Sequence, residues 1–294
     1  IVVAAGGIFN VILGFVLFLF IVPALSPIST NVIDEVVENS YIEEAGILPG
    51  DEVVEINGKH VSFYNDISLY TQDFRAGEEC ELVVKRDGEK LSFTFRPSES
   101  VTEYTYTDEG IEVTSSMNGV SEETVLYRYG EGAERDDSKI GTTETVTRLI
   151  IGFRPQQEDI NALNIWGEAW NETKFVVKLV YNSLWQMVTG RVGMDQMSGP
   201  VGIVSEVNNA VNSGSESWLY VLNLTALLTI NLGVFNLLPI PALDGGRLLF
   251  MIIELIRRKP IPPEKEGIVH AIGFLLLIAL IIAVSFNDIM RLIR

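Results

Sequence analysis

The sequence has little cysteine, little histidine and few basic residues among its 294 positions. The single cysteine, Cys80, excludes an intrachain disulfide and any zinc site built from several cysteines. The two histidines, His60 and His270, are far apart in the sequence, which limits the metal site that the chain can build alone. With 21 basic against 39 acidic residues, the chain lacks the clustered positive charge that binds phosphate, so we expect no nucleic-acid partner.

Hydrophobic residues are nevertheless abundant, at 47% of the chain, and they are separated from the acidic ones. Apolar runs cover residues 1–22, about 219–243 and about 268–286. Each run is close to the roughly 20 residues that cross a bilayer as a helix. The sequence therefore predicts a multi-pass α-helical protein of the cell membrane, with three spans in contact with membrane lipid and an acidic soluble region between the first two.

A basic cluster, Arg257-Arg258-Lys259, lies between the second and third apolar runs. Positively charged loops stay on the cytoplasmic side, so this cluster predicts an extracytoplasmic soluble region. Arg291 and Arg294 near the other end of the third run argue mildly against that orientation.

Residues 31–97 change to short, β-branched runs that are typical of strands. The pairs Asn57-Gly58 and Asp87-Gly88 accept the positive φ that tight hairpins require. Between them, Ser62 has the features of an N-cap, and apolar residues follow at helical spacing as far as Phe74. These patterns predict a small domain of about five strands and one or two helices.

The acidic stretch 99–139 carries 11 acids and 3 bases, which predicts either a solvated hairpin extension or a flexible insertion. Residues 145–153 return to a strand pattern, and 160–188 form an amphipathic helical pattern containing Trp166, Trp170 and Trp185. A helix of that kind lies along the lipid headgroups or packs on the soluble domain, and the sequence leaves both interpretations open.

The second apolar run contains unusual polar chemistry, with Asn231, Asn236, Pro239, Pro241 and Asp244 in close succession. An uncompensated Asp at membrane depth costs about 2.5–3.5 kcal/mol, so its presence calls for a cation, a proton or an aqueous cavity. The prolines break the helix just before it and free backbone groups that must find partners. Two simpler interpretations stay open: Asp244 only caps the following helix, and the asparagines only bond neighbouring helices.

The string from Asn231 to Arg247, preceded by Ser198-Gly-Pro-Val-Gly-Ile203, closely resembles the C-terminal half of the site-2 proteases, the intramembrane zinc metalloproteases of peptidase family M50. The stretch Ala4-Ala-Gly-Gly-Ile-Phe-Asn10 resembles the segment that opens their second transmembrane helix. Residues 31–97 resemble their extracytoplasmic PDZ domain, through Ala45-Gly-Ile-Leu-Pro-Gly-Asp51 and Ile56-Asn-Gly58.

This resemblance implies a fold and a set of roles. It implies an α+β PDZ-like domain inserted between spans, and a Zn²⁺ ion bound by Asp244 together with two histidines of an HExxH helix. It also implies that Asn236, with Asn231, Pro239 and Pro241 around it, binds the unwound backbone of a substrate. The expected substrate is the transmembrane segment of a single-span membrane protein, such as an anti-sigma factor or a signal-peptide remnant.

No HExxH motif occurs in the 294 residues, and neither His60 nor His270 has the neighbours to replace it. We therefore expect an N-terminally truncated fragment that contains no catalytic residue of its own, although its family is enzymatic. The alternatives are a non-catalytic, membrane-anchored PDZ adaptor and a transporter, and the transporter lacks the inverted repeat that it needs.

The expected organisation has six segments: a transmembrane helix (1–26), the PDZ-like domain (27–98), an acidic, partly β insertion (99–157), an amphipathic helical region (158–217), the Leu-Asp-Gly transmembrane helix with a cytoplasmic extension (218–258), and a loop with the last transmembrane helix (259–294).

Overall fold

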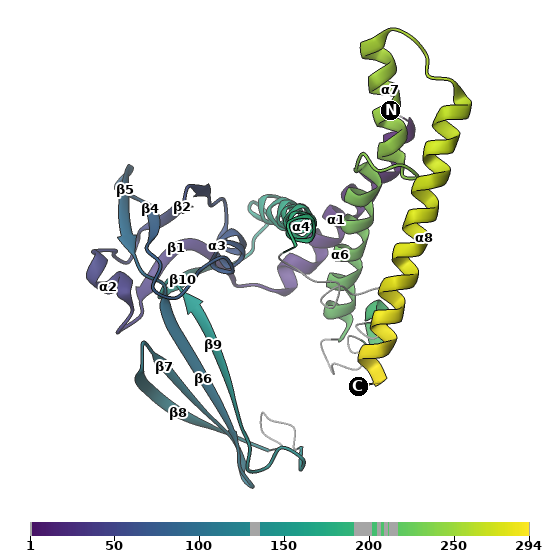
Figure 1. The fold of residues 1–294 in the computed structure, drawn as a ribbon. Helices are drawn as coiled ribbons and strands as arrows, with labels where there is room; N and C mark the ends of the chain where they lie inside the picture. Colours follow the sequence, from purple (N-terminus) through teal and green to yellow (C-terminus); the bar gives the residue numbers. More distant parts are fainter. Residues whose placement is uncertain are drawn as a thin grey trace. The chain divides into compact units, whose positions relative to one another are not determined.

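The computed structural model describes residues 2–129, 136–190, 202–204, 207–208, 211 and 217–293. The chain divides into two compact units (Figure 1). The helical unit combines Ile1–Ser26 with Ile160–Arg294, and the β unit is Pro27–Asp159. Each unit has a hydrophobic core of its own.

The helical unit contains α1 (Val2–Ala24), α4 (Ile165–Val188), α6 (Ser217–Leu237), α7 (Asp244–Arg257) and α8 (Pro263–Ile293). Three of these helices, α1, α6 and α8, are long and apolar enough to cross a membrane. This confirms the three expected spans, which are set by runs of apolar residues that suit the bilayer interior.

Helices α1 and α6 pack side by side along most of their length (Figure 1). Their shared core includes Phe18, Ile21 and Ile230, each almost completely buried. Helix α4 adds Val176 to this core, so its buried face packs on membrane helices of its own unit. Its tryptophans are 51–63% exposed, and the rings of Trp166 and Trp170 lie beside Phe15 of α1, with centroids 6.3 and 6.1 Å apart. The position of α4 along the headgroups stays a prediction.

The β unit begins with a six-stranded sheet that is antiparallel throughout, in the order β10-β1-β2-β4-β5 with β3 paired to β2. Thirteen buried residues around Val53, Leu82 and Val84 form its core. The bounds are β1 (Ile28–Val36), α2 (Tyr41–Ala45), β2 (Glu52–Ile56), β3 (Lys59–His60), α3 (Tyr64–Thr71), β4 (Cys80–Arg86), β5 (Glu89–Phe95) and β10 (Phe153–Glu158).

Both predicted hairpin turns are confirmed, because Asn57 and Asp87 have φ values of 49° and 51° and their glycines follow with positive φ. The predicted N-cap is wrong. Phe63 occupies the N-cap position of α3, without a capping hydrogen bond from its side chain. Ser62 precedes it and donates its backbone N–H to the carboxylate of Asp66 at 2.9 Å. The carboxylate in the first turn thus reaches back to an N–H group that precedes the helix, as the acid of a capping box does.

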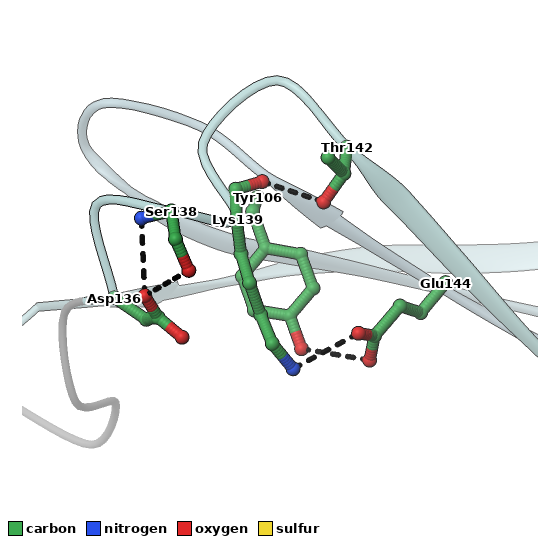
Figure 2. Close-up of polar contacts among 6 residues, drawn as sticks. All are labelled: Tyr106, Asp136, Ser138, Lys139, Thr142 and Glu144. Atoms are coloured by element: carbon green, nitrogen blue, oxygen red, sulfur yellow. Dashed lines mark hydrogen bonds and ion pairs between the residues drawn. The ribbon is translucent and has the colours of Figure 1, made fainter. Parts of the chain in front are cut away.

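The acidic stretch is a second, four-stranded antiparallel sheet, in the order β8-β7-β6-β9. Its strands are β6 (Ser98–Tyr106), β7 (Gly110–Met117), β8 (Val120–Arg128) and β9 (Thr143–Ile150). Figure 2 shows how its far end is fastened, where the Glu144 carboxylate accepts hydrogen bonds from Lys139 and from the Tyr106 hydroxyl at 2.9 and 3.0 Å. Of the two alternatives, the described residues show the hairpin extension.

Candidate metal and substrate site

The expected break in the second apolar run lies between α6 and α7. Helix α6 ends at Leu237, residues 238–243 are not helical, and Asp244 is the first residue of α7. The N-cap of α7 is Leu243, so the interpretation of Asp244 as a simple helix cap is wrong. In the first turn its negative charge still meets the positive end of the helix dipole.

Glycines allow the broken segment to fold tightly onto α7. A Cβ atom at Gly245 would overlap the backbone carbonyl oxygen of Leu238, and one at Gly246 would overlap that of Ile240. The Gly-Gly pair is therefore required because loop backbone passes directly over the first turn of α7. This close approach fixes where the helix begins, and with it the position of Asp244.

The side chain of Asp244 points toward the N-terminal part of α1. A Cβ atom added to Gly6 would lie 3.6 Å from Asp244 Oδ2. The carboxylate is half-buried, and it accepts no hydrogen bond or ion pair from the residues that the structure describes. A partly buried carboxylate without a protein partner beside a glycine is suited to an added cation.

The same glycine-rich stretch of α1 also meets the end of α6. A Cβ atom at Gly7 would lie 2.7 Å from Leu237 Cγ, and one at Gly233 would lie 2.7 Å from the Gly7 carbonyl oxygen. Asn10 packs on this crossing, with its Cβ 3.0 Å from the Cβ position of Gly233. Asp244 and the last turn of α6 therefore both lie against one stretch of α1.

The predicted substrate-binding residues have different surroundings. Asn231 and Asn236 are half-buried on α6, on either side of Gly233. Pro239 is exposed in the loop, whereas Pro241 lies so close to α8 that a Cβ atom at Gly273 would be 2.5 Å from its carbonyl oxygen.

The structure extends the site to α8, which the sequence did not indicate. An apolar cavity of about 280 Å³ lies between the loop and this helix, lined by Ile240, Pro241, Val269, Ile272, Gly273, Leu276, Leu277 and Leu280. His270 on the same helix accepts a hydrogen bond from the backbone N–H of Ala242. Of the Ser198–Ile203 motif, residues 198–201 lie outside the described residues, and the Gly202 N–H donates to Asp288 at 2.9 Å.

Within the described part of the chain, no three His, Cys, Asp or Glu side chains gather into a possible metal site. His60 belongs to the β unit and His270 contacts the loop. The assignment of Asp244 as a metal ligand stays a prediction, and a complete zinc site needs ligands beyond this group.

The β unit contains a separate hollow, of about 650 Å³, beside the edge strand β10. Helix α3 lines one side of it, and the segment that joins β9 to β10 lines the other. Its lining residues include Tyr64, Ile67, Ser68, Thr71, Ile151 and Phe153. An edge strand beside a helix is an arrangement that can accept an additional, extended strand.

Comparison with known proteins identifies the family. The model of peptidase family M50 matches residues 1–280. The zinc metalloprotease RasP of Oceanobacillus iheyensis is 32% identical over 98% of this chain, and that of Bacillus licheniformis is 34% identical over 99%. The regulator of sigma-W protease RasP of Bacillus subtilis is 32% identical over 99%.

In each of these three pairs the chain spans 58% of the relative's length. The matched region includes the Asn231–Arg247 segment, the α1 glycines and the whole β unit. By these matches, the chain belongs to peptidase family M50, the site-2 proteases.

Proposed function

We propose that this chain supplies Asp244 as one ligand of a catalytic Zn²⁺ ion in an intramembrane metalloprotease that cleaves transmembrane segments. The proposal rests on one observation, which is that the carboxylate of Asp244 has no described protein partner and points toward Gly6. The names of the relatives, which are zinc metalloproteases, support it.

The residues present fit a zinc ion, although they do not complete its coordination. A carboxylate oxygen is a normal zinc ligand, and the absence of a Cβ atom at Gly6 leaves space beside it. The remaining ligands would be the histidines of an HExxH helix elsewhere in the protein. When bound, the metal would act as a Lewis acid and make water a stronger nucleophile at neutral pH.

The chain's own residues would prepare the substrate. A peptide bond within a helix is shielded by its own hydrogen bonds, so the substrate must unwind before cleavage. Asn236, in the last turn of α6, would replace some of the lost hydrogen bonds with its side-chain amide. The non-helical backbone around Pro239 and Pro241 would shape the space that receives the unwound segment.

Two substitutions in the full-length gene product test these roles. We expect Asp244→Ala to abolish both zinc retention and cleavage of a single-span membrane substrate, because a ligand is lost. We expect Asn236→Ala to lower turnover while zinc stays bound. Glu264→Gln, an exposed acid of the same unit, is the matched control and should change neither. Normal zinc content in the Asp244→Ala protein would remove the metal assignment.

A non-catalytic adaptor is the second candidate, because the described residues contain no complete metal site. The adaptor would use the β unit to bind a partner and would cleave nothing. Absence of zinc and of cleavage in the unsubstituted full-length protein would favour this candidate over the protease.

We propose that the β unit is a PDZ-like domain on the extracytoplasmic side that holds the trimmed end of a substrate as an added strand. The edge strand β10 and the hollow beside α3 support this role. The family resemblance itself favours another role for this unit, as a filter that admits or excludes substrates by size.

Filling the hollow separates these two roles. Ser68 is exposed and lines the hollow, so Ser68→Trp should occupy it without disturbing the core. We expect KM for a substrate already trimmed outside the membrane to rise about tenfold, which is 1.4 kcal/mol of binding. Thr94→Trp, on an exposed position of β5, is the control. An unchanged KM would favour the size filter.

A further inference from the structure

His270 joins α8 to the loop that leads into Asp244. Its Nδ1 accepts a hydrogen bond from the backbone N–H of Ala242 at 2.8 Å. Its ring also lies beside the ring of Phe250 on α7, with centroids 5.6 Å apart. The half-buried side chain of His270 therefore contacts both the loop and α7, and Asp244 lies where these two segments meet.

The residue that His270 holds has an unfavourable backbone conformation. Ala242 has a φ of 83°, in the left-handed region that is unfavourable for a residue with a Cβ atom. Such a conformation persists where surrounding contacts hold it in place. The hydrogen bond to His270 is a contact of this kind, and it acts two residues before Asp244.

A second residue on the same face of α8 fixes the neighbouring loop position. Gly273, one turn after His270, has no side chain, and a Cβ atom there would lie 2.5 Å from the Pro241 carbonyl oxygen. Helix α8 therefore fixes two consecutive loop residues, Pro241 by close backbone approach and Ala242 by a hydrogen bond. The two contacts leave the loop little freedom to shift relative to α8.

We infer that His270 is a positioning residue that holds the loop of residues 238–243 so that the Asp244 carboxylate points toward Gly6. The inference rests on the proposed role of Asp244 as a zinc ligand. His270 would act through its accepting nitrogen and would not itself bind the metal. Its Nδ1 accepts the hydrogen bond from Ala242, so in the neutral ring the hydrogen is on Nε2. That buried Nε2 has no hydrogen-bond partner among the described residues, and it lies 3.8 Å from Glu266 Oε1 on its own helix.

Three substitutions in the full-length protein separate this role from simple packing. His270→Leu removes the acceptor and puts an apolar side chain of similar size in its place. His270→Asn returns an acceptor oxygen close to the position of Nδ1. Phe274→Leu, at a 57% exposed position of the same helix, is the control for changing a ring to leucine.

The first measurement is the rate at which zinc is lost to a chelator. We expect His270→Leu to lose zinc at least about tenfold faster than the parent, as is usual when a residue supporting a metal ligand is removed. His270→Asn should recover most of the difference, and Phe274→Leu should match the parent. Equal rates for the parent and His270→Leu, or no recovery with His270→Asn, would overturn the inference.

The second measurement needs no metal. Leu243→Cys introduces a thiol at the end of the loop, and the rate at which a thiol reagent labels it measures how often the loop opens. The natural Cys80 is buried and gives a low background of labelling. We expect His270→Leu to accelerate this labelling about threefold or more in metal-free protein. An unchanged labelling rate would overturn the inference.

Asp244→Ala distinguishes failure of the inference from failure of the proposed function. If the parent binds zinc and Asp244→Ala does not, the proposed function holds and the His270 variants test the inference alone. If Asp244→Ala retains zinc, the proposed function fails and the inference fails with it.

Discussion

Glycine serves different purposes in the two units. In the β unit, Gly58 and Gly88 have φ values of 74° and 87°, and a Cβ atom added to either would meet nothing within 4 Å. In the helical unit, a Cβ atom at Gly7, Gly233 or Gly245 would run into a neighbouring segment. At these turns the β unit uses glycine for backbone conformation, although Gly110 and Gly152 of that unit also allow close approach, and the three glycines of the helical unit serve close approach alone. Replacing glycine by alanine, which adds one methyl group, should therefore reduce function more at the close approaches of the helical unit than at the turns of the β unit.

Two acids, one from each unit, differ in their hydrogen-bond partners. Asp51 in the β unit is 1% exposed and accepts hydrogen bonds from Arg86 at 2.7 Å and from the Leu48 N–H at 2.9 Å. Asp244 is half-buried, and within the described residues it has no such partner. A satisfied buried acid stabilises a fold, whereas an unsatisfied one is expected at a functional site.

The largest effect is expected from Gly245→Ala. The added Cβ would overlap the Leu238 carbonyl oxygen, so the loop or the start of α7 must move and carry Asp244 with it. Misplacement of a reacting group by about 1 Å can cost about 100-fold in rate. We expect a loss of that size in cleavage by the full-length protein, with a parallel loss of zinc measured by metal analysis.

The matched control is Gly267→Ala on α8, where an added Cβ would meet nothing within 4 Å. The same change there should leave activity intact and slightly favour the helix, since alanine is the better helix former by about 1 kcal/mol. Full activity in Gly245→Ala would contradict the close approach and weaken the contrast between the units.

Local features of this fold could be predicted from the sequence. Three apolar runs predicted the spans, and the Asn57-Gly58 and Asp87-Gly88 pairs predicted their turns, because length and local backbone preference decide both. The pairing of β10 with β1 could not be predicted, since Ser29 meets Gln157 across more than a hundred residues. The sequence leaves the second sheet open because the acidic stretch contains few large apolar residues, so no clear strand pattern stands out.

For the candidate site, the sequence predicted the break in the helix and did not predict the contacts between helices. The prolines and Asp244 stand out in an apolar run because each is costly there, and the structure does break the helix between Leu237 and Asp244. The roles of Gly6 and His270 depend on which helices pack together. A contact such as that between Ala242 and His270 leaves no pattern in the sequence.

A smaller effect, on stability, is expected from Asp51→Asn in the β unit. The substitution removes the charged acceptor of the Arg86 hydrogen bonds, and the Arg86 side chain is 27% exposed and stays partly solvated, so we expect unfolding of this unit to become easier by about 2 kcal/mol. Labelling of Cys80, which is 4% exposed and lies in the same core, measures this unfolding in increasing urea. The exposed Glu144→Gln should give no resolvable change. Equal effects of the two substitutions would contradict the assignment of Asp51 as the stabilising acid.

The pH dependence of the stability difference between the parent and Asp51→Asn tests whether the charge of Asp51 causes that difference. Burial opposes ionisation of Asp51, but the hydrogen bonds from Arg86 and Leu48 and the attraction of the Arg86 charge outweigh it and lower the pKa of Asp51 in the folded protein. A lowered folded-state pKa gives stability that is fully present above the unfolded pKa, about 3.9, and lost as the pH falls through the folded value. The gap between the parent and Asp51→Asn, followed by thermal unfolding from pH 6 downward, should therefore shrink below about pH 4. A gap that stays constant to pH 3 would assign the effect to packing instead of charge.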